Sequence, residues 1–289
     1  MFKDFLNSYA RTLIMGILNI TPDSFYDGGK YLDQKNLKNK FDFLNKSDII
    51  DIGAESSRPG AVKVDEVTEI KRISSIIPFL NKKNKYYSID TYKPNVASFA
   101  IKNGFNMVND ITGGSNPLML DIVSDANIPI VLMHMQGNPK NMQNNPRYNN
   151  IIDDLLSFFE TRIESCLKHG ISKNQIIIDP GIGFGKDSEQ NISLINNISI
   201  FHALGCLIML GVSRKRFISS LANSEKPKDR LSGSISAALY GFSHGVQIFR
   251  VHDVKETKQA LGMWSKLGVW FKMKKFFFGT DGIRGIVNK

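Results

Sequence analysis

Two aspartates each stand at the end of an apolar run, where a carboxylate could take part in binding. Asp90 closes the run Tyr86–Asp90, and Asp179 closes Gln175–Asp179. A buried carboxylate needs hydrogen-bond donors, because without them its pKa rises until the group is neutral. A ligand that presents amino and N–H groups side by side would supply these donors, and Asn109 could add both a donor and an acceptor. The alternative is that both acids cap helices or pair with lysines.

Two basic side chains later in the chain could bind an anion that has several oxygens. Arg250 and His252 alternate in the run Gln247–His252, so both side chains would point the same way in a strand. Arginine makes paired hydrogen bonds to phosphate oxygens and histidine adds a donor, which suits a diphosphate. A structural ion pair is the alternative. Asn19 offers a carbonyl oxygen suited to one position around Mg²⁺, with phosphate and water completing the shell.

Two further segments have the composition of loops that cover a site. The segment 53–61 holds Arg58 between a hydroxyl pair and a Pro-Gly turn, which could place a guanidinium over an anion. The segment 21–29 carries acids and aromatic residues before two glycines, which is typical of a closing lid or of a simple turn. Lys215 follows another strand, where its ammonium could meet a ring carbonyl or a carboxylate. We interpret His134 as structural and not as a metal ligand.

The glycine-rich loop after Asp179 is superficially similar to a phosphate-binding loop. A Walker A motif needs G-x-x-x-x-G-K-[ST]. The spacing of Gly181, Gly185 and Lys186 falls short of that pattern, and Asp187 stands where the hydroxyl should be. We therefore predict no nucleotide-binding loop here.

A set of parallel strands is needed to bring these residues together. Eight short aliphatic runs recur along the chain, separated by amphipathic segments such as 65–80, 93–103, 150–169 and 253–267. This alternation is typical of parallel strands joined by helices. All eight runs end in polar or glycine-rich sequence, whereas a doubly wound sheet would gather such residues at one crevice. We predict an α/β fold, a single-domain (β/α)₈ TIM barrel over 1–268. The expected strands are Leu13–Asn19, Asp48–Ile52, Tyr86–Asp90, Asn106–Asp110, Pro129–Met135, Gln175–Asp179, Cys206–Gly211 and Gln247–His252.

Length and composition narrow the functional class. The chain has 289 residues, of which 42% are hydrophobic and 22% charged, and it contains no apolar stretch that could span a bilayer. No signal peptide is recognisable, and Cys166 and Cys206 show neither disulfide nor zinc spacing. We expect a soluble, cytoplasmic protein with no membrane partner.

The net charge of +10 indicates little about partners. Residues 272–289 hold five basic side chains and one acid, which is a net +4, and the rest is spread along the chain. Nucleic-acid binding calls for clustered Lys and Arg. We expect no nucleic-acid partner, and a mildly positive field that attracts small anions.

Seven motifs, taken in order, resemble dihydropteroate synthase over roughly residues 10–268. The resemblance implies condensation of 6-hydroxymethyl-7,8-dihydropterin diphosphate with 4-aminobenzoate, which releases diphosphate and forms 7,8-dihydropteroate in folate biosynthesis. It also implies Mg²⁺, sulfonamide sensitivity and a homodimer. The motifs are Gly16–Phe25, Glu55–Gly60, Ser88–Thr91, Asn109–Ile111, Asp179–Lys186, Ser213–Lys215 and Arg250–Asp253.

The same resemblance implies roles for single residues, transferred position by position. The pterin would be held or lined by Asp90, Asn109, Ile111, Met133, Asp179, Phe184, Gly211 and Lys215. The diphosphate would be held by Asn19, Arg58, Arg250 and His252, with Asn19 also the ligand of Mg²⁺. The 4-aminobenzoate would be framed by Phe25, Ser57, Pro59, Phe184 and Ser213. The candidate catalytic residues are Asp27, Asp90, Lys215, Arg250 and His252.

The reaction implied by the resemblance begins with loss of the diphosphate in an SN1-like step. The aryl amine then attacks a pterin-stabilised cation. Such a sequence relies on stabilising the leaving group and the cation and needs no enzyme nucleophile. Asp27, in the expected lid, would stabilise the cation. Ser57 departs from the threonine of many relatives but keeps the hydroxyl.

Residues 269–289 do not continue the barrel pattern. The segment Met273–Gly285 resembles the beginning of phosphoglucosamine mutase, including the run Phe-Gly-Thr-Asp-Gly-Ile-Arg-Gly. The phosphorylated serine loop and metal ligands of such an enzyme do not follow, so we expect no mutase activity. We expect a disordered or loosely docked appendage that was joined from a neighbouring reading frame.

Two other functions are compatible with part of this pattern. Another pterin-binding barrel enzyme, of the methyltetrahydrofolate methyltransferase type, could share the two acids and the asparagine. It would not need Arg58, Arg250 and His252 for a leaving diphosphate. A non-catalytic pterin-binding protein is the third possibility, but every expected polar position is present.

Overall fold

Eight parallel strands close into a barrel within the part of the chain that the structure describes. The computed structural model describes residues 12–21, 34–56, 62–80, 85–137, 141–142, 145–222 and 226–267. Each strand pairs with the next in sequence order and β8 pairs with β1, so the predicted (β/α)₈ barrel is confirmed. The strands are β1 (Leu13–Asn19), β2 (Ile49–Gly53), β3 (Tyr86–Asp90), β4 (Met107–Asp110), β5 (Ile130–Met133), β6 (Ile176–Asp179), β7 (Leu207–Leu210) and β8 (Ile248–Val251).

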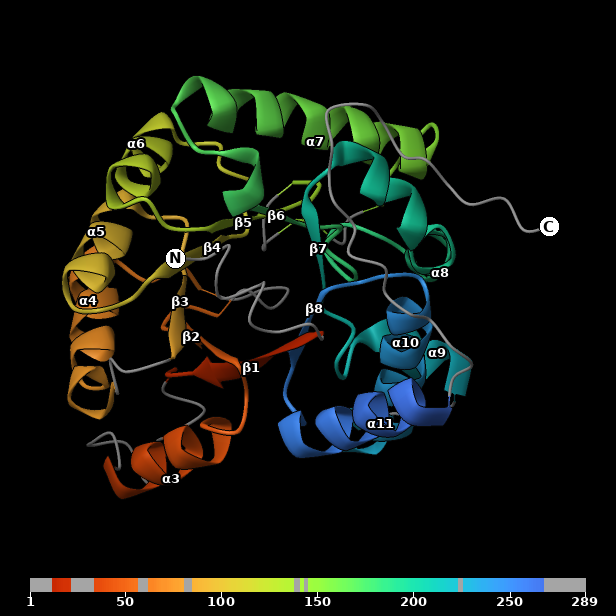
Figure 1. The fold of residues 1–289 in the computed structure, drawn as a ribbon, viewed down its shortest axis with the longest axis horizontal. Helices are drawn as coiled ribbons and strands as arrows, with labels where there is room; N and C mark the ends of the chain where they lie inside the picture. Colours follow the sequence, from red (N-terminus) through yellow and green to blue (C-terminus); the bar gives the residue numbers. More distant parts are fainter. Residues whose placement is uncertain are drawn as a thin grey trace.

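Helices form a layer outside the barrel (Figure 1). None of the helices in the described ranges is long and apolar enough to cross a membrane. The α-helices are α3 (Gln34–Leu44), α4 (Glu66–Ser74), α5 (Pro94–Lys102), α6 (Pro117–Ala126), α7 (Ile151–Lys168), α8 (Ser188–Asn196), α9 (Arg216–Ala222), α10 (Leu231–Ser243) and α11 (Val254–Leu267). The short 3₁₀ helices are η1 (Ile77–Phe79), η2 (Lys173–Gln175), η3 (Ile198–Leu204) and η4 (Pro227–Arg230).

Local sequence explains where the helices begin and end. The Asn150 side chain accepts the Ile152 N–H and starts α7, which ends before His169. Gly170 follows with φ +84, as a helix-stop glycine should. The helix expected over 65–80 is wrong at its end, because α4 stops at Ser74 and the chain continues as η1. Pro78 lies inside η1 and lacks the N–H that a continuing α-helix needs.

Five of the expected strands are longer in sequence than in the structure, and β5 and β8 are two of them. The run Pro129–Met135 forms a ladder only over β5, and Gln247–His252 only over β8. The backbone N–H of His252 leaves the ladder and donates to Ser213 Oγ at 3.2 Å. The His252 side chain therefore lies past the end of the β8 ladder.

The barrel interior has an apolar floor and a polar upper level. The floor consists of buried, mostly aliphatic side chains from all eight strands: Leu13, Met15, Ile49, Tyr86, Met107, Val131, Ile177, Met209 and Ile248. One register level places Asn19 beside Gly53, Gly53 beside Asp90, and Asp90 beside Asn109. Because alternate residues of a strand face the same way, the polar residues lie above the floor at the carboxyl ends of the strands.

Candidate active site

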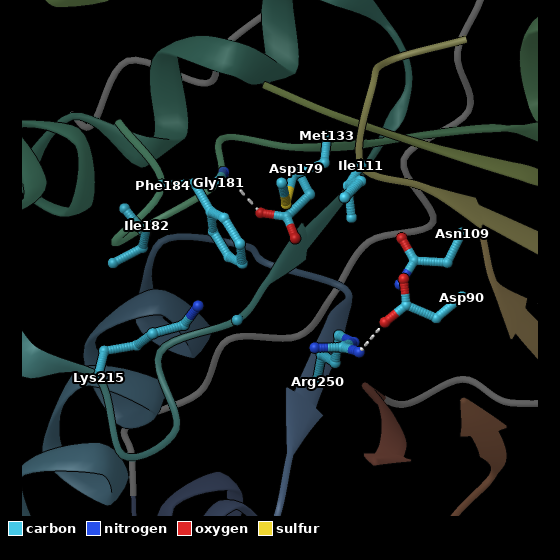
Figure 2. Close-up of a pocket in the computed structure, with 11 residues that line it drawn as sticks. Asp90, Asn109, Ile111, Met133, Asp179, Gly181, Ile182, Phe184, Lys215 and Arg250 are labelled. Atoms are coloured by element: carbon cyan, nitrogen blue, oxygen red, sulfur yellow. Dashed lines mark hydrogen bonds and ion pairs between the residues drawn. The ribbon is translucent and has the colours of Figure 1, made fainter. Parts of the chain in front are cut away.

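A pocket at the carboxyl ends of the strands brings together the residues that the sequence assigns to a pterin. Asp90 and Asn109 enter it from one side, and Asp179, Phe184 and Lys215 from the other (Figure 2). Gly181, Ile182 and Arg250 complete the lining. All eight expected pterin residues line this one pocket: Asp90, Asn109, Ile111, Met133, Asp179, Phe184, Gly211 and Lys215.

One side of the pocket, which we call the arginine side, consists of Asp90, Asn109 and Arg250, together with the buried Asp51, which contacts Asn109 and Arg250 but does not line the pocket. Arg250 Nη2 donates to Asp90 Oδ2 at 2.7 Å, and Arg250 Nε donates to Asp51 Oδ2 at 2.6 Å. Asn109 Nδ2 donates to the same Asp51 oxygen at 3.1 Å. The exposed fraction falls from 16% for Arg250 to 10% for Asp90 and 0% for Asp51. The charged groups on this side are therefore paired with one another, and they range from a partly exposed arginine to a completely buried aspartate.

The acids of the arginine side affect one another. Burial raises the pKa of Asp90 to about 7, although the Arg250 charge lowers it, and the Asp51 charge adds to the increase. Burial alone would lower the pKa of Arg250, but Asp51 and Asp90 outweigh burial and raise it. The guanidinium is therefore charged, and its hydrogen bond to Asp90 favours the ionised form of an acid that burial alone would neutralise.

The opposite side, which we call the lysine side, consists of Asp179, Phe184 and Lys215. The Gly181 N–H donates to Asp179 Oδ1 at 2.8 Å, and burial raises the pKa of this acid. Lys215 Nζ lies 4.0 Å from the centroid of the Phe184 ring. Burial lowers the pKa of Lys215 to about 8. Lys215 Nζ has no hydrogen-bond or ion-pair partner among the described residues, so this charge is available to a ligand.

The glycine-rich loop beside the lysine side is held by a second buried lysine. Lys186 Nζ donates to Phe184 O at 2.9 Å and to Gly181 O at 3.2 Å, and it lies 2.9 Å from His134 Nδ1. Burial lowers the pKa of Lys186 to about 7 and that of His134 to about 2. A Cβ at Gly181, where φ is +66, would lie 2.0 Å from His134 O. These contacts agree with a structural role for His134 and explain the lysine and glycine without nucleotide binding.

His252 and Ser213 lie together beyond the ends of β8 and β7. His252 Nδ1 lies 3.1 Å from Ser213 Oγ. Burial lowers the pKa of His252 to about 3, and the charges of Arg250 and Arg214 lower it further. A neutral imidazole can donate from only one nitrogen. In this structure the His252 imidazole is therefore neutral and has one N–H to donate.

Asn19 ends β1 next to the pocket mouth. A Cβ built on Gly53 would lie 3.4 Å from Asn19 Oδ1 and 3.4 Å from Asp90 Oδ2, so both oxygens face the space that the glycine leaves. The described residues include no group of three His, Cys, Asp or Glu that could hold a metal by itself. One amide oxygen fits an Mg²⁺ ion that takes its other ligands from phosphate and water.

Five of the expected site residues lie outside the described residues: Phe25, Asp27, Ser57, Arg58 and Pro59. The residues before and after 57–61 are described, and both of these flanks contact the Lys93 side chain. Its Nζ donates to the Glu55 carboxylate, to Val64 O at 2.5 Å and to Glu69 Oε2 at 2.6 Å. The two ends of this segment are thus fastened to the start of α5.

Sequence reasoning missed Asp51. The residue lies inside β2, between Ile50 and Ile52, and two positions before Gly53. The run was treated as apolar with a polar end, although an acid between two isoleucines is itself an unusual feature of a buried strand. Its two-residue offset from Gly53 was the available signal, since that offset places Asp51 on the face that points into the barrel.

Comparison with known proteins bears on the same region of the chain. The family described as pterin binding enzyme matches residues 15–252. Dihydropteroate synthase of Escherichia coli K12 is 39% identical over 251 residues, which cover 86% of this chain and 89% of that protein. The structure of Yersinia pestis dihydropteroate synthase with a sulfonamide drug has a TM-score of 0.83 and 38% identity, covering 89% of this chain and 94% of that one. The Xanthomonas albilineans enzyme in complex with 7,8-dihydropteroate has a TM-score of 0.80 and 34% identity, covering 90% and 95%.

Proposed function

This chain belongs to the pterin binding enzyme family, and we infer that it catalyses the dihydropteroate synthase reaction. It is a transferase that condenses 6-hydroxymethyl-7,8-dihydropterin diphosphate with 4-aminobenzoate to give 7,8-dihydropteroate and diphosphate. The observation that carries this conclusion is the single pocket lined by all the residues expected to hold the pterin. The relatives and the solved structures carry the same activity in their names.

We propose that the pterin lies between the arginine side and the lysine side. Asp179 and Asp90 would accept from its amino and ring N–H groups, and Asn109 would offer its amide oxygen. Asn109 Oδ1 is buried and has no hydrogen-bond partner among the described residues. The Lys215 ammonium lies over the Phe184 ring and would donate a hydrogen bond to the ring carbonyl of the pterin. The ligand thereby satisfies groups that are otherwise costly to bury.

We propose that catalysis rests on the leaving group and on the charge that forms in the ring. Arg250, His252 and Arg58 would bind the diphosphate and stabilise it as the bond to the pterin breaks. Asp90 and Asp179 would offset the positive charge spread over the ring, and Asp27 would face the same cation. Loss of the leaving group needs no nucleophile from the protein, since the amine of 4-aminobenzoate completes the substitution.

We propose that Asn19 holds Mg²⁺ together with the diphosphate, and that this ion neutralises part of the leaving group's charge when bound. The 4-aminobenzoate would lie between Ser213 and Phe184 on the described side and Phe25, Ser57 and Pro59 on the other. Homodimer formation and a cytoplasmic location are part of the same proposal. We also propose that residues 269–289, with their likeness to the start of phosphoglucosamine mutase, take no part in catalysis.

The decisive experiment measures diphosphate release from the pterin diphosphate with and without 4-aminobenzoate. We expect release that depends on 4-aminobenzoate and Mg²⁺ and that produces an equal amount of 7,8-dihydropteroate. Chromatography of the pterin product provides the second readout. Absence of any 4-aminobenzoate-dependent release would end the synthase proposal. Methyl transfer from methyltetrahydrofolate would instead support the methyltransferase alternative.

A further inference from the structure

Asp51 is placed to act on the site without touching a ligand. It is completely buried and does not line the pocket. A single oxygen, Oδ2, accepts both Arg250 Nε at 2.6 Å and Asn109 Nδ2 at 3.1 Å. The other oxygen, Oδ1, has no partner among the described residues. A buried carboxylate costs stability when one of its oxygens has no partner, so a contribution to folding does not explain Asp51. The explanation must come from its contacts with Asn109 and Arg250.

The contact with Asn109 determines which way its amide points. A side-chain amide has one accepting and one donating end, and the two have nearly the same shape. Because the Asp51 carboxylate can only accept, it selects the Nδ2 end of Asn109 for itself. The Oδ1 end is left without a partner at a residue that lines the pocket. Asp51 thereby makes Asn109 an acceptor for a ligand N–H.

The contact with Arg250 leaves the guanidinium anchored at one end. Nη2 is bonded to Asp90, which lines the pocket and is the acid expected to accept from the pterin (Figure 2). A ligand that takes the Asp90 carboxylate competes with Nη2. Nε is bonded to Asp51, which the ligand does not reach. The arginine therefore keeps one fixed hydrogen bond while its outer nitrogens change partner.

We propose that Asp51 is the positioning residue of this site, which directs Asn109 Oδ1 toward the pterin and serves as the fixed anchor on which Arg250 exchanges Asp90 for the leaving diphosphate. The proposal rests on the proposed synthase function. It assigns to Asp51 a role that acts only through the two residues that it holds.

The register supplies a matched control. Ser88 lies directly beside Asp51 in the β2–β3 ladder, is also completely buried, and its Oγ has no partner among the described residues. Ser88→Ala removes a buried polar atom from the same level without releasing Asn109 or Arg250. We expect its kcat/KM to stay within about 3-fold of the wild-type value, as for a change that affects packing only.

The first test combines Asp51→Asn with Arg250→Lys, since lysine keeps a charge but has no Nε. We expect Asp51→Asn to lower kcat/KM for the pterin diphosphate about 100-fold in the wild-type background, the usual scale for a lost charged hydrogen bond. In the Arg250→Lys background the same change should cost no more than about 10-fold, because the anchored group is already absent. Equal losses in the two backgrounds, or an Asp51→Asn variant as active as Ser88→Ala, would overturn the proposal.

A second test uses the unaltered chain, so it holds even if Asp51→Asn fails to fold. The Arg250 Nε–H resonance, assigned by its loss in Arg250→Lys, is followed by NMR while 6-hydroxymethyl-7,8-dihydropterin and inorganic diphosphate are added. We expect the Nε–H to stay protected from exchange while the Nη signals shift. Loss of protection at Nε on binding would show that Asp51 is not a fixed anchor.

The two proposals fail in different ways. If the wild-type chain makes no dihydropteroate, the synthase function is wrong, whatever the variants do. If the wild-type chain is active but Asp51→Asn costs the same in both backgrounds, or if the Arg250 Nε–H exchanges freely, only the role of Asp51 is wrong.

Discussion

The two sides of the pocket bury similar charges in opposite ways. On the arginine side, Arg250 is paired with Asp51 and Asp90. On the lysine side, Asp179 accepts from a backbone N–H, and among the described residues the Lys215 ammonium contacts the Phe184 ring without a hydrogen-bond partner. A ligand must exchange contacts on the first side, whereas it adds contacts on the second. The arginine side can therefore orient a ligand, and the lysine side can supply most of the binding free energy.

The largest effect is expected from Asp179→Asn, which tests whether the lysine side binds through unmatched charge. We expect kcat/KM to fall at least about 100-fold, because a charged hydrogen bond to the pterin is lost. The free energy of unfolding should not decrease, since burial already raises the pKa of this acid. Urea denaturation and steady-state kinetics measure both quantities, with exposed Asp125→Asn as the control. A variant that loses stability together with activity would show that Asp179 is structural.

The second test replaces Lys186, whose ammonium has hydrogen-bond acceptors in the glycine-rich loop. Lys186→Met should lower the free energy of unfolding by about 2 kcal/mol, because buried carbonyls of the glycine loop lose their donor. Those carbonyls belong to Gly181, Phe184 and His134. Thermal unfolding measures the change. Unchanged stability would mean that the glycine-rich loop keeps its shape without Lys186. Lys186 would then not be the stabilising lysine of the pair Lys186 and Lys215.

Lys215→Met provides the comparison, because this lysine is partly buried and has no hydrogen-bond acceptor among the described residues. We expect kcat/KM to fall about 10- to 100-fold through the lost contact with the ring carbonyl. The free energy of unfolding should rise, in contrast to Lys186→Met, since a partly desolvated charge with no hydrogen-bond acceptor among the described residues is removed. A parallel loss of stability in both lysine variants would remove the distinction between them.

The stability gained in Lys215→Met should depend on pH, which tests the difference between the two lysines further. The pKa of Lys215 falls from 10.5 to about 8 on folding, so the unfolded chain binds more protons between these values. The destabilising contribution of Lys215 is therefore complete below about pH 8 and fades as the pH rises toward 10.5. The stability advantage of Lys215→Met should shrink over this interval, which urea unfolding at several pH values would show. An advantage that is constant with pH would mean that folding does not lower the pKa of Lys215.

The smallest effect is expected from removing residues 268–289, which lie outside the described residues and beyond the family match. The family match ends at residue 252 and α11 ends at Leu267. We expect kcat/KM to be unchanged and the free energy of unfolding to stay within about 0.5 kcal/mol. A larger loss in either quantity would show that this segment has become part of the fold.

Much of the fold and the site could be read from local sequence. Strand runs with polar ends predicted the barrel, because burial on both faces demands apolar residues until the chain leaves the sheet. Asp90, Asn109, Asp179 and Lys215 were found because each interrupts an apolar run at its end, or follows one, and because ordered motifs carried the resemblance. Asp51 was not found, since it lies inside a strand run and its contacts with Asn109 and Arg250 come from strands far away in the sequence.

The sequence by itself determined the eight strand runs and the polar residues at their carboxyl ends, because burial on both faces keeps a parallel strand apolar until the chain leaves the sheet. Its ordered motifs, through the resemblance that they carry, selected the residues that line one pocket. Only the tertiary structure decided that Arg250 pairs with Asp51 and Asp90, that Lys215 has no partner among the described residues, and that Lys186 holds the loop. Those choices depend on distances between strands far apart in the chain, which closure of the barrel sets and which no local pattern contains.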